Sequence, residues 1–286
     1  MRRSANHKLR SVADGRPLFD PEGVFWRVNR EMVLLLGGGA ALLSQVAHPL
    51  VAAGVYEHSG FREQPLRRLY GTVTAMQRMI YGPRQVAEET AARIRGIHRR
   101  IHGHLPLDSA AFPKGTRYDA CDPALLLWVH STLVGTAVST YETFFPPLSP
   151  AEREDYYQES KLIGRLVGLG LHQLPGGWTD FETYYHGVLD GNTLDVTSMT
   201  RELAHHILYP PVSWVPHVAG DVLSIATVAL LPQALRDRYA LPWSDRRQLA
   251  WRFASRTIRR VLPYMPGLAR TGPRVWQLER RLRASS

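Results

Sequence analysis

Apolar residues recur along this chain at the three-to-four-residue spacing that places them on one face of a helix. No stretch keeps up the strict alternation of a half-buried strand, and glycine and proline fall mainly between the apolar segments. The pattern therefore predicts an all-α fold. We expect helices over residues 22–36, 40–47, 83–102, 201–208, 218–231 and 244–262, with further helices starting near residues 49, 65, 123, 150 and 179.

Several of these helix starts carry capping signals. Asp122 followed by Pro123 is a strong start, because aspartate accepts from free backbone N–H groups and proline suits the first helical position. Residues 149–152 and 179–182 each have the spacing of a capping box, and Asp195 is a candidate cap for the helix over 201–208. Residues 103–121 are expected to form a loop.

The chain contains no internal repeat and no linker long enough to separate two domains. We expect one helical domain over residues 21–271, preceded by a flexible arm over 1–20. Residues 272–286 are expected to form a basic tail, or a last helix with an apolar stripe that contains Val275, Trp276, Leu278 and Leu282.

One uncharged stretch, residues 32–56, is long enough to cross a bilayer. Its three consecutive glycines and its His48-Pro49 pair divide it, so a buried pair of core helices is the favoured interpretation. The charged N-terminal residues have no apolar run behind them, as a signal peptide requires, so we expect a cytoplasmic protein without a transmembrane segment.

The charge is uneven. Thirteen arginines and three acidic residues between Arg236 and Ser286 account for the whole net charge of +10. The single cysteine, Cys121, excludes an intrachain disulfide and a zinc–thiolate cluster. We expect its thiol to be a buried small side chain rather than a haem ligand.

Three histidines lie in apolar helical sequence. On a helix that begins at Pro123, His130 shares its face with Leu126, Leu133 and Val134, so the imidazole is expected to be buried. A buried histidine either satisfies its nitrogens with hydrogen bonds or binds a ligand. His48 and His58 flank a further helix, where they could line a pocket or cap the helix ends.

Two segments carry a resemblance to a known family. They are residues 48–59, His-Pro-Leu-Val-Ala-Ala-Gly-Val-Tyr-Glu-His-Ser, and residues 126–134, Leu-Leu-Trp-Val-His-Ser-Thr-Leu-Val. Over roughly residues 25–235 the chain resembles the bacterial and fungal family that contains the rubber oxygenases and the mycophenolic-acid-pathway oxygenase. The resemblance implies a partly globin-like haem-binding core, non-covalent haem b, and His130 as the proximal iron ligand.

The same resemblance suggests further roles. Arg68 and Thr72, four residues apart, would hold a haem propionate, and His58 would lie against the cofactor. Glu57 and His48 are candidates for proton handling. Rubber oxygenases carry a lysine just before that threonine, whereas this chain has Gly71 there. We therefore expect oxidation of an apolar or aromatic small molecule by dioxygen or peroxide, with an electron donor as a possible partner, and not rubber cleavage.

Other patterns compete with this interpretation. Glu202 and His205 form one Glu-x-x-His unit, but a di-iron bundle needs two such units and further carboxylates. His98 and His102 have metal-ligand spacing but sit among arginines, which favours a solvated basic face. The alternative function is a non-redox binding protein, in which the Arg- and Trp-rich C-terminal region contacts nucleic acid or an anionic membrane; nucleic acid is not the favoured partner.

Overall fold

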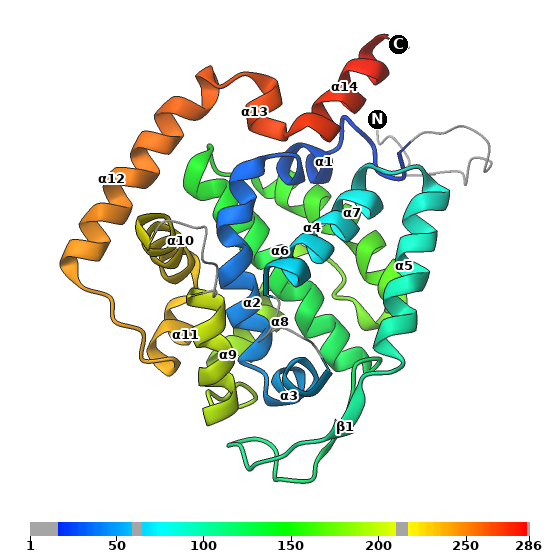
Figure 1. The fold of residues 1–286 in the computed structure, drawn as a ribbon. Helices are drawn as coiled ribbons and strands as arrows, with labels where there is room; N and C mark the ends of the chain where they lie inside the picture. Colours follow the sequence, from blue (N-terminus) through cyan, green and yellow to red (C-terminus); the bar gives the residue numbers. More distant parts are fainter. Residues whose placement is uncertain (1–16, 59–64, 210–216, 285–286) are drawn as a thin grey trace.

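The computed structural model describes residues 17–58, 65–209 and 217–284, and for residues 65–69 and 217–221 it describes the backbone alone. The expected all-α single domain is confirmed, because helices form nearly all of the regular structure (Figure 1). The likeness to a globin core stays a prediction, and most of the expected N-terminal arm lies outside the described residues.

In chain order the first elements are α1 (Val24–Asn29), the 3₁₀ helix η1 (Met32–Gly37), α2 (Gly38–Val46), α3 (Pro49–His58), α4 (Pro65–Tyr81), α5 (Arg84–His98), β1 (His102–His104) and β2 (Arg117–Asp119). The remaining elements are α6 (Pro123–Phe144), α7 (Pro150–Val167), η2 (Leu171–Gln173), α8 (Trp178–Asp190), α9 (Ser198–Leu208), α10 (His217–Leu230), α11 (Gln233–Arg238), α12 (Asp245–Val261), η3 (Leu262–Tyr264), α13 (Gly267–Thr271) and α14 (Pro273–Ala284).

Helix α6 is the central element of the fold. The Asp122 carboxylate accepts from the Ala124 N–H at 2.7 Å, as expected from the sequence. Helices α2, α7 and α8 and the 3₁₀ helix η1 pack around α6. A helix that is apolar nearly all round buries most area when other helices enclose it, and α6 accordingly contributes Trp128 and Phe144 to the core.

The chain bends by 107° between the η1–α2 segment and α3, at His48 and Pro49. The expected break is therefore confirmed. The glycines at the junction of η1 and α2 also allow close packing of α2 against its neighbours. A Cβ on Gly37 would collide with Thr140 of α6, and one on Gly39 would collide with Thr227 of α10. Glycine is thus required at both positions for α2 to approach its neighbours.

Helix α6 is also long and apolar enough to cross a membrane, and the bent η1–α2–α3 segment passes the same test as a pair. Within the described residues, 61% of the apolar window in α6 is buried inside the molecule. Enclosure of this kind is what the core helix of a globular domain shows.

Some local expectations are wrong. The helix expected over 22–36 breaks at Arg30 and Glu31, where Glu31 takes an extended conformation and turns its carboxylate into the molecule. The loop over 103–121 contains an antiparallel hairpin of β1 and β2. The helix expected to reach residue 102 ends at His98. Cys121 is exposed rather than buried.

Two helix starts also differ from the sequence prediction. Helix α8 begins at Trp178, so the capping box expected at 179–182 does not form. Helix α9 is capped by Thr197, whose side-chain oxygen accepts from the Thr200 N–H. Asp195 instead accepts from the Ala110 N–H at 2.8 Å and ties the hairpin region to the start of α9.

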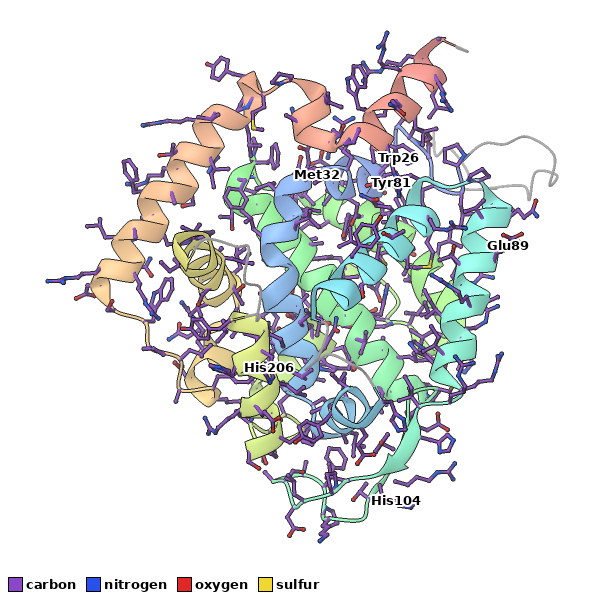
Figure 2. All side chains as sticks on the ribbon, in the orientation of Figure 1. Trp26, Met32, Tyr81, Glu89, His104 and His206 are labelled. Atoms are coloured by element: carbon purple, nitrogen blue, oxygen red, sulfur yellow. The ribbon has the colours of Figure 1, made fainter. Side chains whose placement is uncertain are left out.

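The last helices form an arch over one end of the molecule (Figure 1). Helix α14 packs on α1, where Trp26 Nε1 donates to Glu279 Oε1 at 3.0 Å. Trp26 and Tyr81 lie together beneath this contact (Figure 2), with ring centroids 4.7 Å apart. The C-terminal residues thus cover a fully buried tryptophan near the start of the chain.

Candidate functional site

His130 lies two turns into α6 and is 4% exposed. Its Nε2 is buried and has no hydrogen-bond partner. Burial lowers the pKa of the imidazole to about 4, because the charged form cannot be hydrated there. The ring is therefore neutral at physiological pH. A buried polar atom without a partner costs stability, so this nitrogen calls for a functional explanation.

The rotation of α6 fixes the direction of His130. Trp128 Nε1 donates to the Ser44 carbonyl oxygen at 3.2 Å and so faces α2. His130 follows two residues later, about 200° further around the helix axis. The imidazole therefore points away from α2. One turn earlier on the same face, Leu126 packs against Leu169 and Leu174, so the wall around this face is apolar.

His48 is buried at the bend between α2 and α3. Its Nδ1 accepts from the Leu50 N–H at 3.3 Å, and its carbonyl oxygen accepts from the Ala52 N–H. The side chain thus caps α3, one of the two roles considered for it. Burial lowers the pKa of His48 to about 4, against an opposing effect of Asp122. The ring also lies near Phe112, with centroids 5.4 Å apart.

Glu57 and His58 come together at the other end of α3 with a third residue, Tyr118 of β2. The Tyr118 hydroxyl donates to Glu57 Oε2, and His58 Nε2 lies 3.1 Å from the same hydroxyl. His58 Nε2 is also 3.2 Å from the His102 carbonyl oxygen. Burial, helped by the bond to Glu57, raises the pKa of the Tyr118 hydroxyl. The three side chains form one hydrogen-bonded group.

Sequence reasoning missed Tyr118. A single tyrosine in an expected loop gives no periodic or motif signal, and only the pairing of β1 with β2 brings it to α3. Tyr118 and the residues of α3 share a small hydrophobic cluster beside the main core. His48 and the Glu57–Tyr118–His58 group thus lie at opposite ends of one helix.

Helix α4 carries Arg68 and Thr72, as expected. The side chain of Arg68 lies outside the described part of the structure. Ala75 and Met79 of this helix are buried in the core, yet Gly71 and Thr72, one turn earlier on the same face, are exposed. A Cβ on Gly71 would meet no atom within 4 Å. The inner face of α4 is therefore uncovered at Gly71 and Thr72.

The competing metal sites gain no support. The described residues contain no group of three histidine, cysteine or acidic side chains able to hold a metal ion. Glu202 accepts from the Tyr56 hydroxyl at 2.9 Å. The solvated basic helix face expected for His98 and His102 is wrong, because α5 ends at His98 and His102 begins β1. The Nδ1 of His98 is buried without a partner, and burial lowers its pKa.

A cavity of about 260 Å³ lies on another side of α6. Its aromatic wall comes from α8, and its α6 lining includes Gly135, Ser139 and Glu142. These three positions lie roughly 120–180° around the axis from His130. The cavity is therefore separate from the surroundings of the imidazole.

Comparison with known proteins identifies the family of the chain. The sequence profile of the ER-bound oxygenase mpaB/B′ and rubber oxygenase catalytic domain matches residues 26–260. The chain belongs to this oxygenase family. The match confirms the resemblance seen in the sequence and extends it through nearly all of α12.

Two relatives of this oxygenase-family chain are uncharacterized proteins from Mycobacterium tuberculosis and Mycobacterium bovis. Each is 28% identical over 239 residues, which cover 79% of this chain and 88% of the relative. No solved structure matches the chain significantly. The family thus points to an oxygenase catalytic domain, with dioxygen and a small molecule as its substrates.

Proposed function

We propose that this protein is a haem b-dependent oxidoreductase, with His130 as the proximal iron ligand. The observation that carries the proposal is the buried, neutral imidazole of His130, whose Nε2 has no hydrogen-bond partner. A neutral imidazole nitrogen is the usual proximal ligand of haem iron. The family supports oxygenase chemistry, and the haem is our own inference.

The donor set of the chain fits haem b. A pKa of about 4 means that no proton competes for the Nε2 lone pair at physiological pH. The apolar wall beside His130 suits a flat hydrophobic macrocycle. The chain has one cysteine, so it has no motif for covalent attachment through two thioethers. Bound haem would supply a redox-active iron for reaction with dioxygen or peroxide.

Helix α4 would hold the polar edge of the cofactor. A guanidinium at Arg68 and a hydroxyl at Thr72 can both donate to a propionate carboxylate, and charge-assisted bonds of this kind are the stronger ones. The uncovered inner face at Gly71 and Thr72 supports this placement. Because residue 71 is glycine, this face of α4 lacks the lysine that rubber oxygenases carry at the same position.

Proton handling falls to the groups on α3. His48 accepts the Leu50 N–H at Nδ1, so Nε2 carries the proton of the neutral ring and is the nitrogen that would donate a hydrogen bond to a bound ligand. Glu57 accepts a hydrogen bond from the Tyr118 hydroxyl, and His58 Nε2 lies within hydrogen-bond distance of the same hydroxyl. A proton can therefore pass along these three side chains without large movement. His58 would also border the cofactor. The substrate would be an apolar or aromatic small molecule, with an external electron donor where the reaction needs one.

The absorption spectrum tests the proposal. Protein expressed with ample haem precursor should show a Soret band and about one haem per chain by pyridine haemochrome assay, and His130→Ala should lose both. His104→Ala is the control at an exposed histidine, and His98→Ala is the control at the other histidine with a buried, unpartnered ring nitrogen. A colourless wild-type protein, or a folded His130→Ala variant with full haem, would contradict the proposal.

A further inference from the structure

Helix α12 lies at the edge of the molecule (Figure 1). Its side chains form two unlike faces. On the inner face, Trp251 meets Phe144 of α6 edge-on with ring centroids 6.0 Å apart, and Ile258 packs against the main core. The opposite face carries Leu249 and Phe253, which are 69% and 74% exposed. Large apolar side chains of this kind are rarely left so open on consecutive turns without a partner surface.

Arginines surround these two apolar side chains. The exposed arginines of α12 are Arg246, Arg252, Arg256, Arg259 and Arg260. No guanidinium of this set forms a hydrogen bond or an ion pair with another described residue. On a helix wheel, Arg246, Arg256 and Arg260 lie within about 60° of Leu249 or Phe253. The outer face of α12 is therefore apolar and strongly cationic at once.

Exposed apolar side chains are also found beyond the end of α12. Tyr264 is 88% exposed and Leu268 is 46% exposed, so the two short helices that follow α12 also expose apolar side chains. Helix α10, which packs against α12, exposes Val222 and Leu223. We call the outer face of α12, together with Tyr264 and Leu268, the α12 surface.

We propose that the α12 surface docks onto a lipid bilayer that carries anionic headgroups. Guanidinium groups bind headgroup phosphates and carboxylates, while leucine and phenylalanine enter the boundary between headgroups and acyl chains. The phosphates of a nucleic acid could also pair with the arginines, but a nucleic acid has no apolar layer in which Leu249 and Phe253 could be buried. The exposed apolar side chains therefore favour the bilayer. This inference does not depend on the haem proposal, because docking needs no cofactor.

Vesicle co-sedimentation tests the inference. The full chain is mixed with vesicles of phosphatidylcholine alone, or of phosphatidylcholine with phosphatidylserine. We expect binding to the second kind only, and weaker binding as salt is added. The double variant Arg256→Glu/Arg260→Glu should weaken binding by at least about 25-fold, since each basic residue near an anionic surface contributes about fivefold. Leu249→Ser/Phe253→Ser should weaken it on the order of tenfold.

Matched controls separate the α12 surface from general charge and hydrophobicity. Arg93→Glu/Arg100→Glu makes the same charge change at exposed positions in and just beyond α5, across the molecule. Leu171→Ser removes an exposed leucine elsewhere. Both controls should bind vesicles like the wild type. The inference is overturned if the wild-type protein does not bind anionic vesicles. It is also overturned if the serine double variant binds fully, or if duplex DNA binds as tightly and competes for the same arginines.

Discussion

Arg270 of α13 donates two hydrogen bonds of 2.7 Å to the buried carboxylate of Glu31, one from Nε and one from a terminal guanidinium nitrogen. Arg30 lies 3.5 Å from the same carboxylate. The Glu31 side chain is almost fully enclosed, so these partners offset the free-energy cost of burying its carboxylate. This pair explains why the expected N-terminal helix breaks where it does.

We expect Arg270→Ala to lower the free energy of unfolding by about 2–3 kcal/mol. Breaking a buried pair costs more than that, but Arg270 is partly exposed and Arg30 stays beside Glu31. Arg84→Ala is the control, because its pair with Glu88 is more exposed, and it should cost at most about 0.5 kcal/mol. Urea unfolding measures both, and equal losses would show that the Glu31 contact is no stronger than a surface pair.

Removal of residues 272–286 should lower stability without loss of haem. The truncation deletes α14, so Trp26 Nε1 loses its acceptor Glu279 and the buried Val275 is removed. The site residues on α3, α4 and α6 keep their own contacts. Thermal unfolding and the Soret band measure the two effects. A folded but colourless truncated protein would show that α14 closes the haem site.

Arg68→Ala should lower haem occupancy more than Thr72→Val does. A charge-assisted bond to a propionate contributes on the order of 1.5–3 kcal/mol, against about 0.5–1.5 kcal/mol for a neutral hydroxyl bond. Haem titration of the apoprotein, followed by pyridine haemochrome assay, compares the two variants. Equal occupancy would place Arg68 away from the cofactor.

Gly71→Lys should change the haem spectrum. The position has free space for a new side chain, and a lysine there occupies the place from which rubber oxygenases can reach the iron. We expect the Soret maximum to shift and ligand binding to slow. Gly38→Lys is the control at a second helical glycine with open space around it. An unchanged spectrum in a folded Gly71→Lys protein would mean that α4 does not face the haem.

The apoprotein should become less stable as the pH falls from 6.5 towards 4. His48 has a folded pKa of about 4, below its unfolded value of 6.5, so the unfolded chain binds the extra proton in this window. The loss from this one group is about 2 kcal/mol between pH 7 and pH 5. His48→Asn, whose side-chain oxygen can still accept from Leu50, should remove this contribution and leave the one expected from His130, whose pKa is also lowered to about 4. A variant with the same pH profile as the wild type would contradict this assignment.

The long helices could be predicted from the sequence, because apolar spacing and capping residues such as Asp122 and Ser149 act locally. The break at Glu31 was not predictable, since its cause is an arginine 239 residues away. The strands β1 and β2 span three residues each, which is too short for periodicity to appear. Hence Tyr118 was missed, although the burial of His130 followed from its apolar helix face.

The hydrogen bond from Trp26 to Glu279 also constrains how the protein is made. The two residues are 253 positions apart, so this hydrogen bond cannot form until residue 279 has left the ribosome. During synthesis, α1 can pack on Tyr81 and α7, but Trp26 Nε1 stays without its Glu279 acceptor while α6 and its neighbours assemble. Nascent chains stalled before residue 279 should therefore be more protease-sensitive at α1 than the finished protein, even though Tyr81 and α7 already pack against this helix.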